Sequence, residues 1–175
     1  MGIIKVMDEN LSNKIAAGEV VERVSSVVKE LTENSVDAGS KNITVSLIDA
    51  GIKEIKVVDN GKGMDESDAL LAFTPHATSK IKNENDLFFI NTLGFRGEAL
   101  PSIASVSDTT LLTSDGTSST LVNIKGGKLL KKEVATRNKG TTIIVDNLFF
   151  NTPARLKFLK SFYTEQSSVI NLIEK

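Results

Sequence analysis

Three polar side chains recur on one predicted helical face, in the stretch KELTENSVDAG at residues 29–39. Glu30, Asn34 and Asp37 are spaced i, i+4 and i+7, on the side where a globular helix usually carries Leu or Val. A carboxylate there can orient or deprotonate a water molecule, and an amide oxygen can bind a hard cation such as Mg²⁺. The alternative is that these residues are exposed and simply end the helix before Gly39.

Two glycine-containing stretches are the next candidates for chemistry. In VVDNGKGM a strand is predicted to end at Asp59, and the glycines at 61 and 63 allow a positive φ or a close approach to a ligand. A type I′ hairpin turn would give a similar pattern. In GFRGEAL, residues 94–100, the glycines precede a predicted helix whose free N–H groups favour phosphate, although a plain loop-to-helix junction is the alternative. The chain contains neither a Rossmann fingerprint nor a Walker-type phosphate loop.

The residue pattern predicts the elements that must position these groups. Residues 11–38 are predicted to be helical with a break near Gly18, and the apolar residues of the later part form one stripe. Glu30 and Asn34 fall at the border of that stripe, where a side chain can line a pocket beside a sheet. Two alternating strands follow, in NITVSLI and IKEIKVVDNG, joined by a hairpin at 49–51.

The rest of the chain completes a mixed fold. The pattern predicts a short helix at 67–73, a polar loop at 74–86, a helix opened by GFRGEAL, strands around 109–113, 120–124 and 141–146, and a final amphipathic helix in RLKFLKSFYTEQSSVINLIEK. Helices grouped with a mostly antiparallel sheet indicate an α+β, two-layer sandwich. Residues 1–175 are expected to form one unit, and the end of the sequence inside the last helix predicts a fragment of a longer protein.

Composition excludes several classes of function. The chain has 175 residues, 40% of them hydrophobic, and a formal net charge of -1, so it lacks the overall basic charge of many nucleic-acid-binding domains. It has no cysteine and one histidine, His76, which excludes thiolate chemistry and multi-histidine metal sites. No apolar run is long enough for a signal peptide or a membrane span. A cytoplasmic protein is expected, or a nuclear one if the source is eukaryotic.

Taken together, the motifs resemble the GHKL nucleotide-binding family of gyrase-type topoisomerases, histidine kinases, large heat-shock chaperones and MutL mismatch-repair proteins. The matching stretches are E-x-x-x-N-x-x-D-A at 30–38, D-x-G-x-G at 59–63, the glycine-flanked stretch at 94–100 and G-T at 140–141. Within that family the chain is similar to MutL, through NKIAAGEVVER at 13–23, HATSK at 76–80, GFRGEAL and LFFNTPAR at 148–155. The resemblance implies the GHKL, or Bergerat-type, ATPase fold.

The resemblance also implies Mg²⁺-dependent ATP hydrolysis and assigns roles residue by residue. Glu30 matches the carboxylate that orients or deprotonates the attacking water, and Asn34 matches the amide that binds Mg²⁺. Asp59 matches the acceptor of a hydrogen bond from the adenine amino group, a contact that Thr141 supports. Guanine would place a carbonyl against that carboxylate, so the site is expected to discriminate against GTP.

Further residues are expected to surround the nucleotide: Asp37, Ala38, Gly61, Gly63, Met64, Thr78, Ser79, Lys80, Gly94, Phe95, Arg96, Gly97, Glu98, Ala99 and Leu100. The glycines at 61 and 63 are expected to leave room for the base. Residues 78–80 and 94–100 resemble a lid and its hinge, with the amides of 95–100 directed at the phosphates. His76 is expected to be structural or hydrogen-bonded and not a phosphoacceptor, because it lies within the lid motif.

In the family, ATP binding closes the lid and brings two domains together, and the arm before Gly18 contributes to that contact. The implied function is an ATP-driven conformational and dimerisation switch in DNA mismatch repair. The implied partners are a homodimer or MutL-type heterodimer partner, a MutS-type mismatch-recognition protein, and DNA. A nucleotide-gated interaction module with little hydrolysis, or a sister topoisomerase or kinase domain, is the alternative.

Two features bear on activity and DNA binding. The fragment alone is expected to hydrolyse ATP weakly or not at all, because MutL relatives supply a lysine to the γ-phosphate from a second subdomain. The basic stretch at 125–139, and Arg155, Lys157 and Lys160, are candidates for contacts with DNA phosphates. A solvated hairpin is the alternative for the basic stretch.

Overall fold

A six-stranded sheet forms the centre of the chain in a computed structural model, which describes residues 7, 15, 17–18, 20–80, 92–94 and 97–174. The strand order is β1-β2-β6-β3-β4-β5, and every neighbouring pair is antiparallel. The strands are β1 (Ile43–Ile48), β2 (Glu54–Asp59), β3 (Asp108–Ser114), β4 (Ser119–Lys125), β5 (Lys128–Val134) and β6 (Gly140–Asp146). A 3₁₀ turn, η1 (Asp49–Gly51), joins β1 to β2, as predicted.

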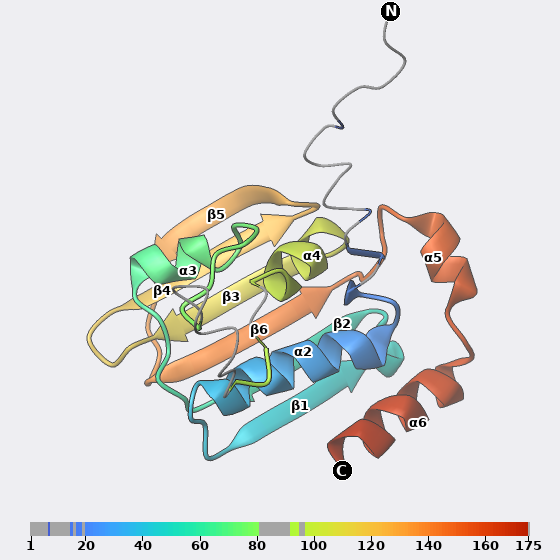
Figure 1. The fold of residues 1–175 in the computed structure, drawn as a ribbon, viewed down its shortest axis with the longest axis horizontal. Coiled ribbons are helices and arrows are strands. Elements are labelled where there is room, and N and C mark those ends of the chain that lie inside the picture. Colours follow the sequence, from blue (N-terminus) through green and yellow to red (C-terminus); the bar gives the residue numbers. More distant parts are fainter. Residues whose placement is uncertain are drawn as a thin grey trace, which may run out of the picture.

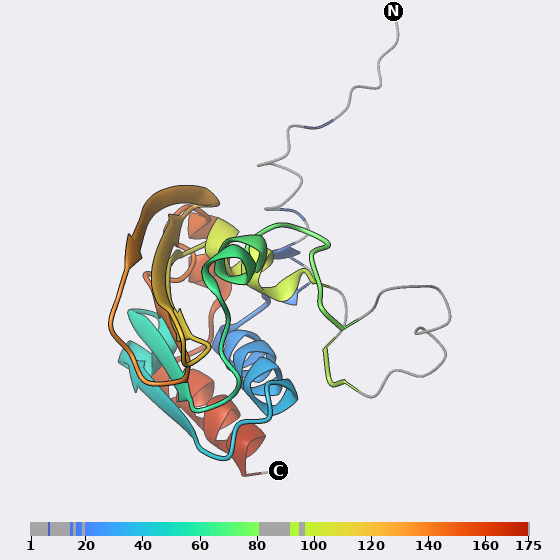
Figure 2. The ribbon, with the colours of Figure 1, turned by 90° about the vertical axis from the view of Figure 1, so that its left-hand side faces the viewer.

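Helices cover one face of this sheet, and the two views show two layers (Figures 1 and 2). Over that face lie α2 (Val24–Asp37), α3 (Glu66–Leu71) and α4 (Ala99–Ser105), whereas α5 (Pro153–Phe158) lies beyond the strand ends and α6 (Phe162–Ile173) packs against α2 and η1. The predicted α+β two-layer sandwich is therefore confirmed. In the part of the chain that the structure describes, none of the helices has the length and apolar character needed to cross a membrane.

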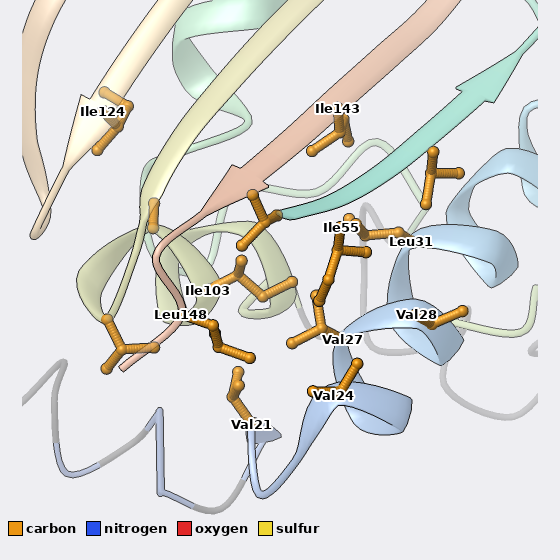
Figure 3. Close-up of a cluster of buried hydrophobic side chains, with 14 of the residues drawn as sticks. Val21, Val24, Val27, Val28, Leu31, Ile55, Ile103, Ile124, Ile143 and Leu148 are labelled. Atoms are coloured by element: carbon orange, nitrogen blue, oxygen red, sulfur yellow. The ribbon is translucent and has the colours of Figure 1, made fainter. Parts of the chain in front are cut away.

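The core lies between α2 and the sheet. The apolar stripe of α2 is buried there, with Val24, Val27, Val28 and Leu31 at most 1% exposed. Figure 3 shows these side chains facing those of the strands and of α4. Burying each such side chain contributes about 1.5–3 kcal/mol relative to leaving it exposed. This packing fixes the rotation of α2, and the polar residues at the border of its stripe take their places from it.

The predicted break in the first helix is misplaced. Residues 15, 17, 18 and 20 are helical, and the interruption falls at residues 21–23, after which α2 begins at Val24. Arg23 is extended there, with φ -155° and ψ 175°. A Cβ at Gly18 would lie 2.3 Å from Nη2 of Arg155, which is the far end of a flexible side chain.

Two further predictions need correction near the end of the chain. The final segment is two helices and not one, because Leu159 is extended and Ser161 starts α6, its hydroxyl accepting a hydrogen bond from the N–H of Thr164. Strand β5 was not predicted as a strand. All seven of its residues are exposed, so it lacks the alternation of a half-buried strand.

Replacing Leu31 tests the role of the α2 stripe. Leu31→Ala should lower the free energy of unfolding by about 2–5 kcal/mol, since the side chain is 1% exposed and its loss leaves a cavity. Val36→Ala is the matched control on the same helix, where the side chain is 52% exposed and the change should stay within about 0.5 kcal/mol. Urea unfolding measures both, and equal losses would contradict the assigned packing.

Candidate functional site

The carboxylate of Asp59 lies at the end of β2 and is 8% exposed. Among the described residues it accepts three hydrogen bonds, each from a different part of the fold. The hydroxyl of Ser35 on α2 donates to Oδ2 at 2.9 Å, and the N–H groups of Gly61 and Thr141 donate to Oδ1 at 2.9 and 3.1 Å. Two carboxylate oxygens can accept about four hydrogen bonds, so this arrangement leaves capacity for one more donor.

Thr141 shares the face of the sheet to which Asp59 points. Val58 pairs with Thr142 across β2 and β6, so the next position along sets Asp59 opposite Thr141. The prediction that these two residues act together is consistent with this geometry, because the backbone of one holds the carboxylate of the other.

The two glycines after Asp59 lie close to other backbone segments of the protein. Gly63 has φ +67°, and a Cβ there would lie 1.8 Å from the carbonyl oxygen of Ser114. At Gly61 a Cβ would lie 2.9 Å from the carbonyl oxygen of Ala38. The prediction that these glycines leave room for a base stays a prediction. The glycines are required because three backbone segments meet around Asp59.

A second cluster forms where α2 ends. The ammonium group of Lys80 lies 2.5 Å from Oδ2 of Asp37 and 3.0 Å from Oδ1 of Asn34. The N–H groups of Leu93 and Gly94 donate to the same aspartate at 3.0 and 3.2 Å. The amide oxygen of Asn34 therefore already faces a cation, and both flanks of the predicted lid are attached to the last turn of α2.

These contacts change the pKa of Asp37. Burial by itself raises the pKa, but hydrogen bonds from Lys80, Leu93 and Gly94, together with the positive charge of Lys80, bring it below the ordinary value of 3.8. Asp37 is therefore ionised in the native state down to a lower pH than in the unfolded chain.

Glu30 lies one helical turn before Asn34 on α2 and is half-buried. Asn34 and Asp37 are half-buried as well, so the three residues that define the predicted polar face are neither core nor fully exposed. The helix does end at Asp37, and Gly39 follows it with φ +73°. The helix therefore ends as the alternative interpretation predicts, whereas ligand chemistry at these residues stays a prediction.

The two ends of the predicted lid meet at its base. The N–H of His76 donates to the carbonyl of Gly97 at 3.1 Å, and Nδ1 of His76 lies 3.2 Å from Oε1 of Glu98. A Cβ at Gly97 would lie 2.5 Å from the carbonyl oxygen of Ala77, so the backbone at Gly97 lies in close contact with the backbone at Ala77. The hydrogen-bonded role predicted for His76 agrees with this geometry.

The remaining predicted site residues are placed less uniformly. The hydroxyl of Thr78 accepts a hydrogen bond from the N–H of Lys80, whereas Ser79 is exposed. Ala99 and Leu100 form the first turn of α4. Phe95 and Arg96, which were predicted to direct amides at the phosphates, lie outside the described residues.

Three residues around Asp59 were not predicted as site residues. Ser35 donates to its carboxylate, and Arg137 donates to its backbone carbonyl at 3.0 Å and to the hydroxyl of Thr142 at 2.9 Å. Thr113 contacts the hydroxyl of Thr141 at 3.1 Å. Ser35 could have been found from its place inside the helical motif. Arg137 and Thr113 come from distant strands and loops, and only the fold brings them here.

The predicted DNA contacts gain little from the structure. In the basic stretch Lys125 pairs with Asp108 at 3.2 Å, Lys131 with Glu133 at 2.8 Å, and Lys132 with Glu66. The guanidinium of Arg155 lies against Gly18. The solvated hairpin is observed, as β4 and β5, and DNA contacts by these residues stay a prediction.

Sequence similarity to known proteins shows the family of the chain. Residues 22–146 match the model of the Histidine kinase-, DNA gyrase B-, and HSP90-like ATPase family. Since the match covers more than half of the sequence, the chain belongs to this ATPase family.

Within the family, the predicted similarity to MutL is confirmed. The chain is 60% identical over 176 residues to the DNA mismatch repair protein MutL of Geobacillus sp. (strain WCH70), and 58% identical over 174 residues to that of Bacillus mycoides (strain KBAB4). These alignments cover 100% and 99% of the chain but only 28% and 27% of the relatives. The chain thus spans a little over a quarter of their length.

Solved structures agree in fold. The chain matches the Aquifex aeolicus MutL ATPase domain complexed with ADP with a TM-score of 0.66 and 31% identity, over 88% of this chain and 54% of that one. It matches the N-terminal domain of a DNA repair protein with a TM-score of 0.77 and 32% identity, over 92% of this chain and 46% of that one.

The depressed pKa of Asp37 predicts a specific pH dependence. Its contribution to stability is fully present above the unfolded pKa, near 3.8, and is lost as the pH falls through the lower folded pKa. Asp37→Asn should therefore lower stability near neutral pH and flatten its decline in acid, as measured by urea unfolding between about pH 6 and pH 2. Asp68→Asn, which removes an exposed carboxylate on α3, is the control for the change of charge alone. An unchanged profile in Asp37→Asn would refute the assignment.

Proposed function

We propose that this chain binds ATP at the wall formed by Asp59 and Thr141. The observation that carries the proposal is the buried carboxylate of Asp59, held by donors from α2, the glycine turn and β6, with capacity for one more hydrogen bond. A purine with an exocyclic amino group supplies that donor. Membership of an ATPase family, and the complex of the Aquifex aeolicus MutL ATPase domain with ADP, support the same class of ligand.

We place Mg²⁺ at Asn34. The fit rests on an observation: its amide oxygen already contacts a cation, the ammonium group of Lys80, at 3.0 Å. Oxygen is the ligand atom that Mg²⁺ prefers, and phosphates and water complete its coordination in nucleotide sites. When bound, the ion neutralises charge on the phosphates. The corresponding work of the protein is to present this oxygen from a helix whose rotation is fixed by the core.

Glu30 is the proposed catalytic residue for ATP hydrolysis. It is half-buried one turn before Asn34, which sets its carboxylate beside the position assigned to the ion and the phosphates. Its role is to orient the attacking water and accept its proton. The water is the nucleophile at the γ-phosphorus. The bond from that phosphorus to the oxygen of the β-phosphate breaks, and ADP is the leaving group.

Lys80 connects the lid to this chemistry. In the structure its ammonium group holds Asp37 and Asn34 together, while Leu93 and Gly94 hold the other flank of the lid to Asp37. Asn34 would give up its contact with Lys80 to hold the ion, and Lys80 would then be available to contact phosphate oxygens. Nucleotide binding is thereby coupled to a rearrangement of residues 78–80 and 92–94, which is the basis for a switch.

On the scale of the full-length protein, we propose a role in DNA mismatch repair. Residues 1–175 would form the nucleotide-binding subdomain, and ATP would control dimerisation with a second copy or a MutL-type partner. A mismatch-recognition protein of the MutS type and DNA are the proposed further partners. The support is the 60% identity to a mismatch repair protein and the lid contacts on α2. A module gated by nucleotide with little hydrolysis is the second candidate, favoured by those same lid contacts.

Asp59→Asn tests nucleotide binding. The Oδ1 position must still accept from Gly61 and Thr141, so the new amide N–H₂ takes the Oδ2 position and opposes the adenine amino group. ATP affinity, measured by calorimetric titration, should fall by roughly tenfold or more, since hydrogen bonds to charged groups contribute about 1.5–3 kcal/mol. Asp49→Asn is the control, because Asp49 is exposed and its φ of +51° is one that Asn tolerates. Wild-type protein that binds no ATP at millimolar concentration would end the proposal.

Glu30→Ala and Asn34→Ala separate the two candidates. In the full-length protein Glu30→Ala should reduce ATP turnover by about 100-fold or more while ATP binding persists, since it removes the group that positions water. Asn34→Ala should abolish the Mg²⁺-dependent part of binding. Phosphate release and ATP titration with and without Mg²⁺ measure the two effects. If turnover in Glu30→Ala equals that of the wild type, the hydrolytic role is refuted and the gated module is favoured.

A further inference from the structure

Thr113 lies directly behind Thr141, on the neighbouring strand, and is fully buried. Its hydroxyl oxygen is 3.1 Å from that of Thr141 and 3.2 Å from the carbonyl oxygen of Gly140. The N–H of Met64 donates to the same oxygen at 3.0 Å. Asp59, Thr141 and Thr113 thus form a row across three adjacent strands, β2, β6 and β3.

Counting protons fixes the direction of these hydrogen bonds. A threonine hydroxyl donates once and accepts twice. Thr113 satisfies all three of its contacts only if it donates to Gly140 and accepts from both Met64 and Thr141. The hydroxyl proton of Thr141 is then used in the contact with Thr113. Its oxygen presents lone pairs alone to whatever lies beside Asp59.

We propose that Thr113 is a specificity-determining positioning residue, which holds the hydroxyl of Thr141 as an acceptor beside the carboxylate of Asp59. The inference rests on the proposed function, because it assumes that a purine occupies this wall. With Thr141 so oriented, the wall contains two acceptors and no side-chain donor from this row. A base that presents an amino group, directly or through one bound water, satisfies it.

The same arrangement rejects a base with a carbonyl at that position. Hypoxanthine carries a carbonyl oxygen in place of the amino group of adenine and a proton on the neighbouring ring nitrogen N1, so ITP exchanges donor and acceptor along this edge with little change of shape. Its carbonyl would face the lone pairs of Asp59 and Thr141. If Thr113 cannot accept, the hydroxyl of Thr141 becomes free to rotate and donate to that carbonyl. Thr113 therefore controls whether one of the two acceptors can become a donor.

The test compares ATP and ITP affinity in Thr113→Val and Thr113→Ser. Valine keeps the shape of threonine and removes the hydroxyl, whereas serine keeps the hydroxyl. In Thr113→Val the ratio of ITP to ATP dissociation constants should fall by roughly five- to tenfold, the equivalent of one neutral hydrogen bond. Thr113→Ser should restore the wild-type ratio. Calorimetric titration measures both nucleotides on the same preparation.

The ratio separates positioning from a structural role. Thr113→Val also removes the acceptor for Met64, and any distortion of the turn that follows should weaken ATP and ITP alike. The double variant Thr113→Val/Thr141→Val adds a second check. Because Thr113 acts through the hydroxyl of Thr141, its replacement should leave the ratio unchanged in a Thr141→Val background. If Thr113→Val fails to fold, Thr113→Ala is measured in its place against the same serine variant.

The possible outcomes distinguish a failure of the role proposed for Thr113 from a failure of the proposed ATP binding. Wild-type protein that binds neither nucleotide refutes the proposed function. Wild-type protein that binds ATP and prefers it to ITP, with the same preference in Thr113→Val, leaves ATP binding intact and overturns the role of Thr113. A shift of the ratio that also appears in the Thr141→Val background overturns it as well. A shift that depends on Thr141 and is reversed by serine supports it.

Discussion

The buried carboxylate of Asp59 is the constraint around which the site is built. A charge at 8% exposure is costly unless donors satisfy it, and here the donors come from α2, from the turn after β2 and from β6. Each donor requires its own segment to be in place. Helix α2 must lie with Ser35 toward the sheet, and the turn must be tight enough for the N–H of Gly61 to reach back two residues. The core packing of α2 and the hydrogen bonds to Asp59 therefore depend on the same placement of the helix.

The same helix carries two kinds of residue whose positions cannot be varied separately. Its apolar stripe fixes its rotation against the sheet, and that rotation sets Glu30 and Asn34 at the border between core and surface. Asp37, in the last turn of α2, accepts hydrogen bonds from both flanks of the predicted lid, at Lys80, Leu93 and Gly94. A rotation of one residue in register would bury the polar face and expose the valines. The helix thus carries the proposed metal ligand, the proposed catalytic carboxylate and the contacts to the predicted lid in one fixed geometry.

Local patterns in the sequence predict much of the fold, whereas contacts between distant segments are beyond them. The strands with alternating burial, the hairpin at 49–51 and the polar face of α2 follow from periodicity and turn residues. Strand β5 shows no alternation because all of its residues are exposed, and the last helix was not divided because the amphipathic pattern continues across Leu159. Gly61 lies close to the backbone of Ala38, a neighbour that no local pattern could name. Thr113 belongs to the site only because β3 is a neighbour of β6, and Arg137, which precedes β6, only because β6 is a neighbour of β2.

A net charge of -1 leaves a chemical question, because a triphosphate is strongly anionic and the chain as a whole does not attract it. The proposed site resolves this by separating the two ends of the ligand. The end for the base presents acceptors, on Asp59 and Thr141, in surroundings already paired with backbone donors. The end proposed for the phosphates has Lys80, whose positive charge is paired with Asp37 in the structure. Since Asp37 is nearly buried and Lys80 is partly exposed, the lysine is the partner that can move. In the proposed site the ion pair would hold the positive charge in place until phosphate binds, and release of Lys80 would couple binding to lid movement.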